Sequence, residues 1–368
     1  MSRLIDAIVP ESIKKLIPYQ SARRIGGHGD IWLNANELEQ AIAYTQDAGQ
    51  YHRYPDFLPG QVAAAYQAYA NTQAEVLAVR GADEAIDLIT RAFCQPGKDK
   101  IAICTPTYAM YQFCAEASLV QTLALPLQGA DFALPLEALI EASVEANVVF
   151  LCSPNNPTGQ VLDKAQVTTL LEHTKEQTLV VIDEAYIEYQ PDASFADLLE
   201  EYPNLVIIRT LSKAFGLAAV RCGFILANPE VMDIVKRLVP PYPMPDPSCE
   251  LVLNALSEQG LTKMQTGVDS LIETRDWFAE QLSNYGFIER VYPSATNFVL
   301  VKTQPEFDLF DYLKQHGVVT RNQAHEDSLK HCVRITIGTR QTMQKVVDLI
   351  DQYTPQSQST ISQNTNQG

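Results

Sequence analysis

The sequence predicts an open α/β fold in which helices cover both faces of a mainly parallel sheet. From about residue 58 to residue 240, apolar runs of strand length alternate with amphipathic stretches of helix length, which is the pattern that βαβ units produce. Three of the apolar runs, 148–151, 179–182 and 205–208, lead directly into polar residues. Ligands of open α/β sheets bind beyond the carboxyl ends of the strands. The three polar ends therefore predict one binding site at a common edge of the sheet.

The composition of the 368-residue chain is that of a globular protein that does not bind nucleic acid. Its length favours two domains around a cleft, and 46% of its residues are hydrophobic, enough for a large core. The net charge is −17 and no cluster of five or more basic residues occurs, so the surface repels nucleic acid and anionic membranes. The seven cysteines contain no CxxC pair, and the six histidines show no zinc-ligand spacing. We expect reduced thiols, no metal and, without a signal-like apolar run near residue 1, a cytoplasmic location.

Along the chain we expect an arm, a large unit, a smaller unit and a tail. Residues 1–30 read as an N-terminal arm, and residues 45–245 as the large unit. Prolines at 240–247 cannot continue any helix and mark its end. A long helical stretch from about 249 to 284 then leads into the smaller unit, for which we expect residues 31–44 and 250–353. The tail, 354–368, is rich in Gln, Ser, Thr and Asn without apolar periodicity, which predicts disorder.

The first elements of the large unit are a strand at 76–79, a helix at 84–93, a strand at 101–104 and a helix at 108–117. The sequence Gly-Ala-Asp-Glu at 81–84 opens the first of these helices. Small residues and free amides at a helix N-terminus can bind phosphate, although many βα turns share this composition.

Lys213 is the main candidate for covalent chemistry. It follows the run 205–208 among small and hydroxylated neighbours, and lysine is rarely placed after a buried strand unless it is paired or reactive. Asp183 closes the run 179–182, where burial would require a cationic partner; the alternative is an exposed N-cap of the next helix. Together with Asn156 and Arg221, these residues supply what pyridoxal phosphate requires: an amine for its aldehyde, a carboxylate for its pyridine nitrogen, and groups that fix its ring and phosphate.

Two tyrosines follow strand ends as well. Tyr186 comes three residues after Asp183 and could reach the phenolic oxygen of a bound ring, and Tyr108 follows the polar segment 105–107, where it could stack on that ring. The alternative for Tyr108 is an ordinary core aromatic residue. Ser212 and Arg221 are placed on the other side of the expected phosphate from the helix that begins near residue 82.

Three motifs carry a resemblance to a known family. The sequences Ser-Pro-Asn-Asn-Pro-Thr-Gly at 153–159, Asp-Glu-Ala-Tyr at 183–186 and Thr-Leu-Ser-Lys-Ala-Phe at 210–215 resemble, in this order and spacing, the fold-type-I pyridoxal-phosphate-dependent aminotransferases. This resemblance implies a large domain with a mainly parallel seven-stranded sheet flanked by helices, plus a smaller α/β domain. Segments 18–24, 32–37, 53–55, 80–84 and 334–338 are in turn similar to the histidinol-phosphate aminotransferases, and the similarity extends over about residues 4 to 350.

The resemblance implies cofactor roles for residues at matching positions. Lys213 would be the Schiff-base lysine and then the base that moves a proton, Asp183 would pair with the pyridine nitrogen, and Asn156 and Tyr186 would hold the ring oxygen O3′. Pyridoxal 5′-phosphate would be bound further by a set of phosphate and ring contacts: the amides of Ala82 and Asp83, Ser212, Arg221, the ring of Tyr108, and Tyr54 from the partner subunit of a homodimer.

It also implies the substrates. Arg334 would bind the carboxylate of glutamate in one half-reaction and the phosphate of L-histidinol phosphate in the other, aided by Arg321, Tyr242 and Tyr19 of the partner. The reaction would convert L-histidinol phosphate and 2-oxoglutarate into imidazole-acetol phosphate and L-glutamate, in histidine biosynthesis. The sequence departs from the usual pattern of this family at two places, Leu38 and residues 244–247. Both places fall where a substrate-facing loop is expected.

Three rival functions share part of this pattern. A threonine-phosphate decarboxylase of the same fold would use the same cofactor residues, and an aromatic aminotransferase would need no phosphate pocket. A transcriptional regulator on this fold would need an attached DNA-binding domain, for which the arm of about 30 residues has no room and the acidic charge is unsuitable.

Overall fold

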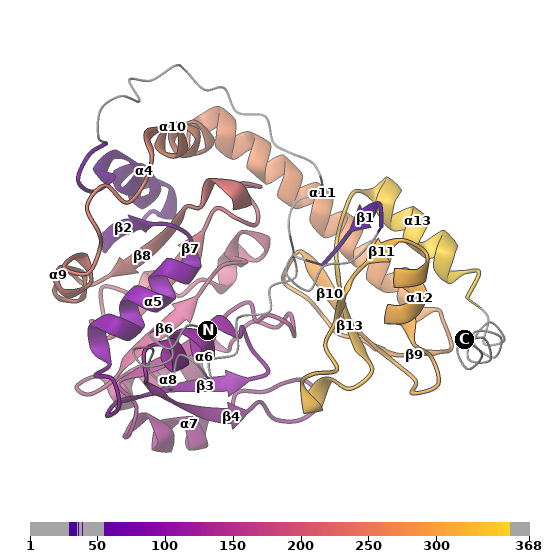
Figure 1. Cartoon of the computed structure of the whole chain (residues 1–368), viewed down its shortest axis with the longest axis horizontal. Coiled ribbons are helices and arrows are strands. Elements are labelled where there is room, and N and C mark those ends of the chain that lie inside the picture. Colours follow the sequence, from indigo (N-terminus) through magenta and orange to yellow (C-terminus); the bar gives the residue numbers. More distant parts are fainter. Residues whose placement is uncertain (1–28, 35, 37–38, 40–54, 354–368) are drawn as a thin grey trace, which may run out of the picture.

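The computed structural model describes residues 29–34, 36, 39 and 55–353. The predicted tail, most of the predicted arm, and the candidates Tyr19, Leu38 and Tyr54 lie outside these residues. The described part of the chain contains three sheets, of seven, four and two strands, and Figure 1 shows the seven-stranded sheet and the four-stranded sheet in different halves of the molecule.

The seven-stranded sheet is mainly parallel, as the sequence predicts. Its strands, in spatial order, are β2 (Glu75–Val79), β8 (Gly223–Ala227), β7 (Leu205–Thr210), β6 (Leu179–Asp183), β5 (Val148–Cys152), β3 (Lys100–Thr105) and β4 (Gln121–Pro126). The neighbours from β7 to β4 are parallel, whereas β8 runs antiparallel to both β2 and β7. Six strands therefore direct their carboxyl ends to one edge.

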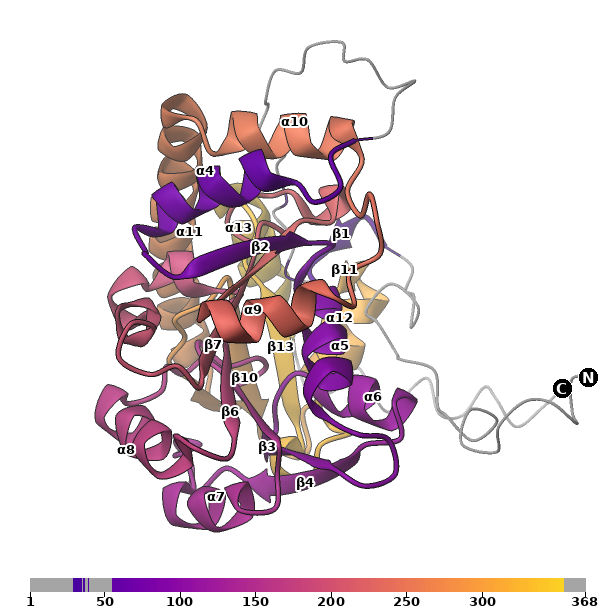
Figure 2. The ribbon, with the colours of Figure 1, turned by 90° about the vertical axis from the view of Figure 1, so that its left-hand side faces the viewer.

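Helices cover both faces of this sheet because its strands are apolar on both sides. In β5, Val148 and Phe150 belong to the core under α5 (Ala82–Phe93), α6 (Met110–Ala117) and α9 (Pro229–Lys236). Val149 and Leu151 face the opposite core, under α4 (Gly60–Ala70), α7 (Leu136–Ser143) and α8 (Lys164–Thr174). The layers are visible in Figures 1 and 2. This alternation explains why the strands read as continuous apolar runs.

The second half of the molecule is built on an antiparallel sheet. Its four strands are β12 (Arg321–Asn322), β13 (Cys332–Thr336), β10 (Phe298–Thr303) and β9 (Ile288–Val291), in that order. Beside it, β1 (Ile31–Trp32) pairs in parallel with β11 (Val318–Val319). The remaining helices of this half are α12 (Leu309–Gln315) and α13 (Arg340–Ile350), and short 3-10 helices occur at Ile187–Tyr189 (η1), Pro191–Ala193 (η2), Ala196–Leu198 (η3), Ala218–Val220 (η4) and Asp327–Leu329 (η5).

The long helical stretch predicted at 249–284 is in fact two helices. It divides into α10 (Asp246–Ala255) and α11 (Glu258–Ser283), because the Ser257 hydroxyl caps α11 by accepting from the Gly260 amide at 3.2 Å. The first helix begins inside the proline-rich run, where Pro247 occupies the first turn and its missing N–H costs nothing. α10 packs against α4, and α11 continues to β9, β10 and α13. The two helices thus connect the halves.

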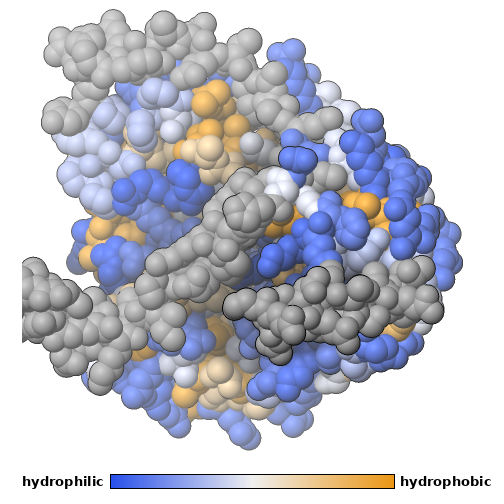
Figure 3. Space-filling model, turned by 45° about the vertical axis from the view of Figure 1, so that its right-hand side comes forward, coloured by the Kyte–Doolittle hydropathy of each residue, from blue (hydrophilic) through white to orange (hydrophobic). Residues whose placement is uncertain are grey.

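The expectations drawn from composition can be compared with the structure at the cysteines and at the surface. All seven cysteines are free thiols, and six of them are buried, as predicted. None of the helices described is long and apolar enough to cross a membrane. Figure 3 shows hydrophilic side chains over much of one face, with apolar residues in separate groups.

Candidate functional site

The polar segments predicted to form a site leave the seven-stranded sheet from adjacent strands. Asp183, the last residue of β6, pairs in register with Cys152, the last residue of β5. Thr210, at the end of β7, pairs with Gly223 at the start of β8. Since β5, β6 and β7 are neighbours, the segments that carry Asn156, Asp183 and Lys213 begin side by side at one edge.

Asp183 is a buried carboxylate, not the exposed helix cap that was the alternative. Only 2% of its surface is exposed, its Oδ2 accepts from the Tyr111 hydroxyl at 2.8 Å, and its Oδ1 accepts from the Ala185 amide at 3.0 Å. Burial raises the pKa of the Asp183 carboxyl to about 6, against the lowering effects of these hydrogen bonds and of the Lys213 charge. A cation placed against it would offset the cost of burying the charge, so the site fits the protonated pyridine nitrogen of the expected cofactor.

Tyr111 is a site residue that sequence reasoning missed. Its ring stacks on Phe150 of β5, with centroids 5.2 Å apart and planes 7° apart, and its hydroxyl reaches Asp183. Tyr108 packs edge-on against Tyr111 at 5.8 Å and donates from its own hydroxyl to Asp83 Oδ1 at 2.9 Å. The available signal was the spacing of three residues at the start of a predicted helix, which places two tyrosines on one side of it.

The start of α5 has the properties of an anion seat. Gly81 is the N-cap residue, with φ of +88°, and it has no side chain that could cap the helix. A β-carbon at Gly81 would lie 2.6 Å from Nη2 of Arg221, so the guanidinium lies directly against this turn, and its Nη2 is 3.6 Å from Asp83 Oδ2. Ser212 lies two residues beyond the end of β7, and its hydroxyl accepts from Thr210 Oγ1 at 3.0 Å. Uncapped amides beside an arginine fit a phosphate group.

Lys213 and Tyr186 lie close together. The Lys213 Nζ is 5.7 Å from the centre of the Tyr186 ring, and Tyr186 itself is only 3% exposed. The Tyr186 hydroxyl accepts from Asn36 Nδ2 at 3.0 Å, and its ring meets Phe298 of β10 edge-on at 5.5 Å. The structure therefore brings Tyr186 of the larger half into contact with residues of the smaller half.

Arg334 makes a second connection between the halves. It lies on β13 and is only 8% exposed. Its Nη1 donates to Asn156 Oδ1 and its Nη2 donates to the backbone oxygen of Asn34 at 3.1 Å. Arg321 of β12 is its cross-strand partner in the register. Like charges directly opposite each other are unfavourable in a sheet, so this pair of arginines favours a bound anion.

The structure places the remaining candidate, Tyr242, between α9 and α10. It is 45% exposed, has φ of +59°, and its ring packs edge-to-face against Phe57 at 6.2 Å. The departure at 244–247 forms the start of α10, with Met244 buried in the core.

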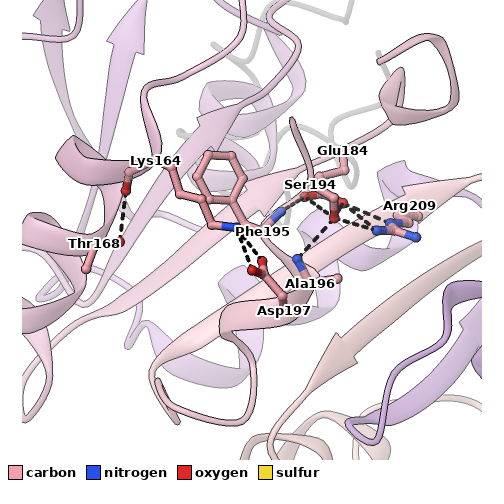
Figure 4. A network of polar contacts seen from close by, with 8 residues as sticks. All are labelled: Lys164, Thr168, Glu184, Ser194, Phe195, Ala196, Asp197 and Arg209. Carbon is pink, nitrogen blue, oxygen red and sulfur yellow. Dashed lines mark hydrogen bonds and ion pairs between the residues drawn. The ribbon is translucent and has the colours of Figure 1, made fainter. Parts of the chain in front are cut away.

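A second buried carboxylate follows Asp183 directly, and sequence reasoning did not single it out. Glu184 is fully buried and forms an ion pair with Arg209 of β7, with 2.8 Å between its Oε2 and Nη2. It also accepts from the Phe195 amide at 2.7 Å, and Ser194 bridges the carboxylate and the guanidinium (Figure 4). We call Glu184, Ser194, Phe195 and Arg209 the Glu184 cluster. It fastens the turn that carries Asp183 and Tyr186.

The chain is similar to a described protein family and to individual known proteins. The sequence model of a family described as "Aminotransferase class I and II" matches residues 29–350. The histidinol-phosphate aminotransferase of Shigella sonnei is 44% identical over 94% of this chain and 97% of its own length. That of Pectobacterium carotovorum is 45% identical over 93% and 96%.

Solved structures share the fold. The histidinol-phosphate aminotransferase of Sinorhizobium meliloti, in complex with pyridoxal-5′-phosphate, superposes with a TM-score of 0.83 at 23% identity, covering 96% of this chain and 98% of that one. The L-threonine-O-3-phosphate decarboxylase of Porphyromonas gingivalis gives a TM-score of 0.71 at 20% identity, covering 88% and 99%. These likenesses confirm the fold predicted from the sequence.

Proposed function

The chain belongs to the aminotransferase class I and II family, and on this premise we propose that it exchanges an amino group between L-histidinol phosphate and 2-oxoglutarate. The products are imidazole-acetol phosphate and L-glutamate, and the reaction is a step of histidine biosynthesis. The observation that carries this proposal is the 44–45% identity to histidinol-phosphate aminotransferases over 93–94% of the chain. The described site supplies groups that such a reaction needs.

The chain's cofactor is pyridoxal 5′-phosphate, which when bound supplies an aldehyde that takes up the amino group and a ring that withdraws electrons from the substrate. We assign Asp183 to its pyridine nitrogen, and Asn156 and Tyr186 to its ring oxygen O3′. The ring of Tyr108 would stack on the cofactor. The phosphate would be held by four groups at the start of α5 and beyond β7: the amides of Ala82 and Asp83, the Ser212 hydroxyl and the Arg221 guanidinium.

Lys213 would hold the aldehyde carbon through Nζ and would afterwards act as the general base of the reaction. Its ammonium group carries the proton that moves between the substrate Cα and the cofactor. Tyr186, which is buried beside it, would help to keep water away from this transfer. Asp183 stays ionised while it faces a cation, although its pKa of about 6 in the cofactor-free protein shows that burial alone does not favour its charge.

Arg334 and Arg321 are the proposed substrate-binding cations, and Tyr242 is proposed to help bind the substrate phosphate. A guanidinium presents two parallel N–H groups, which suit a carboxylate and a phosphate equally. One site can therefore accept glutamate and L-histidinol phosphate in turn.

Assembly, location and domain division are part of the proposal. We propose a cytoplasmic homodimer in which Tyr54 reaches the phosphate of the neighbouring subunit's cofactor and Tyr19 reaches its substrate. We also propose a division into an arm (1–30), a large domain (45–245), a small domain (31–44 and 250–353) and a tail (354–368). The dimer is supported by the similarity at 53–55 and 18–24.

The test is a spectrum of the purified protein, followed by single additions of amino donors. We expect the visible band of the lysine-bound cofactor to disappear on adding glutamate and, separately, on adding L-histidinol phosphate. Lys213→Ala should lack both the band and turnover. Equally fast conversion by phenylalanine with none by L-histidinol phosphate would establish an aromatic aminotransferase, and CO2 release from threonine phosphate would establish a decarboxylase.

A further inference from the structure

Asn36 lies at the boundary between the two halves, with every polar atom engaged. It is 1% exposed and has φ of +55°. Its backbone amide donates to Thr336 Oγ1 at 3.0 Å, and its carbonyl oxygen accepts from Asn297 Nδ2 at 2.8 Å. Its side-chain Oδ1 accepts from the Thr336 hydroxyl at 2.8 Å, and its Nδ2 donates to the Tyr186 hydroxyl at 3.0 Å. Both ends of this buried amide therefore have a hydrogen-bond partner.

The Thr336 hydroxyl contacts the oxygen end of the Asn36 amide. Thr336 Oγ1 accepts from the Asn36 backbone N–H and donates its single hydrogen to Asn36 Oδ1. The amide oxygen therefore faces Thr336, and the NH2 group faces Tyr186. Tyr186 accepts from Asn36, so its own hydroxyl hydrogen must point to another acceptor.

The segment that carries Asn36 is fastened to the smaller half. The Leu33 amide donates to the Val319 oxygen at 2.8 Å, and the Leu33 oxygen accepts from the Thr336 amide at 3.1 Å. Three residues beyond Asn36, Glu39 accepts from the Thr339 amide at 2.6 Å at the start of α13. Asn36 thus reaches Tyr186 from an anchored position.

We propose that Asn36 is a positioning residue that makes Tyr186 a hydrogen-bond donor toward the phenolate oxygen of the bound cofactor. This inference rests on the proposed function, which supplies the acceptor. Asn156 is arranged in a similar way. Its Oδ1 accepts from Arg334, so its NH2 group points away from Arg334 and can donate to another acceptor. Both groups assigned to O3′ are therefore set as donors by residues of the smaller half.

The direct test is Asn36→Asp, measured as the dissociation constant for pyridoxal 5′-phosphate in the full chain. Aspartate keeps the shape, tolerates positive φ and keeps the bond from Thr336, but it presents an oxygen to Tyr186. The Tyr186 hydrogen would then turn to this carboxylate and away from the cofactor. We expect affinity to fall about tenfold, the size of one hydrogen bond to a charged group.

A double-mutant cycle separates this effect from the added charge. In the Tyr186→Phe background, Asn36→Asp should change the dissociation constant less than about twofold, because no hydroxyl remains to be redirected. A tenfold loss that persists in that background would show that the charge acts directly and would overturn the inference.

Thr336 provides an independent pair of variants. Thr336→Val removes the hydroxyl that orients the amide and should weaken cofactor binding about threefold, whereas Thr336→Ser should restore the wild-type value. If the wild-type protein binds and turns over the cofactor while Asn36→Asp and Thr336→Val bind it equally well, the inference fails and the proposed function stands. If the wild-type protein forms no cofactor band, the proposed function fails first.

Discussion

Asp183 and Glu184 are adjacent buried carboxylates, yet they face different surroundings and serve different ends. Asp183, at the edge of the seven-stranded sheet, has a tyrosine hydroxyl and a backbone amide as partners, and burial raises its pKa to about 6. Glu184 has a guanidinium, a hydroxyl and an amide in the Glu184 cluster. A carboxylate whose cationic partner is built into the fold stabilises the fold. One without such a partner in direct contact is available to bind a cation.

The variant Asp183→Asn is the strongest test of the proposed difference between Asp183 and Glu184. We expect turnover to fall roughly 10³-fold, because a neutral amide cannot hold the pyridine nitrogen protonated. The cofactor-free protein should nevertheless become more stable above about pH 6, since the folded state no longer contains a carboxylate whose ionisation is disfavoured. Steady-state kinetics and urea unfolding at pH 8 measure both effects. Loss of stability together with activity would place Asp183 with Glu184 as a structural residue.

Glu184→Gln should do the opposite. Removing one partner of a buried ion pair leaves Arg209 charged within the core, which costs about 3 kcal/mol. The free energy of unfolding should fall by that amount, while the kcat of the protein that remains folded should change little. The measurement is urea unfolding together with kcat per folded active site; Lys164→Ala, which removes the exposed ion pair with Asp197, is the control and should cost under about 1 kcal/mol.

The sequence predicts one side of the site better than the other. Lys213, Asp183 and Asn156 could be identified because each lies at or shortly after the end of an apolar strand, and the parallel sheet aligns those ends. Asn36 could not be given a role, because its partners Tyr186 and Thr336 are 150 and 300 residues away. The Glu184 cluster was missed for a related reason: Glu184 and Arg209 lie just beyond two apolar runs that are distant in sequence, and they become partners only once β6 and β7 pair in register.

The predicted helical stretch at 249–284 shows a local limit of sequence-based prediction. Leu256 and Ser257 continue the polar and apolar pattern of their neighbours, so periodicity does not reveal the break between α10 and α11. Ser257 acts as a cap there, and serine is also tolerated inside helices. The chain turns at this point because α10 packs against α4, whereas α11 packs against the smaller sheet.

Glu188 provides a third carboxylate for the comparison. It is 5% exposed, and within the described residues neither of its carboxylate oxygens has a hydrogen-bond partner. Burial raises its pKa to about 7, against the attraction of Arg209. The folded state therefore holds a proton that the unfolded state releases near pH 4.5, so Glu188 costs stability increasingly as pH rises from about 4.5 to 7.

Glu188→Gln should remove that cost. We expect the free energy of unfolding at pH 8 to rise by up to about 3 kcal/mol and the difference from wild type to vanish near pH 4.5. Urea unfolding across this pH range measures it. A gain that is equal at all pH values would mean that Glu188 has the same pKa in the folded and unfolded states, so that burial does not raise it.

Tyr111→Phe tests the smallest difference between the two carboxylates, the hydrogen bond that the Tyr111 hydroxyl donates to Asp183. The variant keeps the ring stacked on Phe150 and removes one hydrogen bond that lowers the pKa of Asp183. That pKa should rise further, so a larger share of Asp183 is protonated near pH 7 and cannot pair with the pyridinium nitrogen. We expect cofactor affinity to fall about tenfold at pH 7 and to recover as the pH is raised toward 8.5. A loss that is the same at both pH values would mean that Tyr111 supports the site through packing, because only a shifted carboxyl titration makes the loss depend on pH.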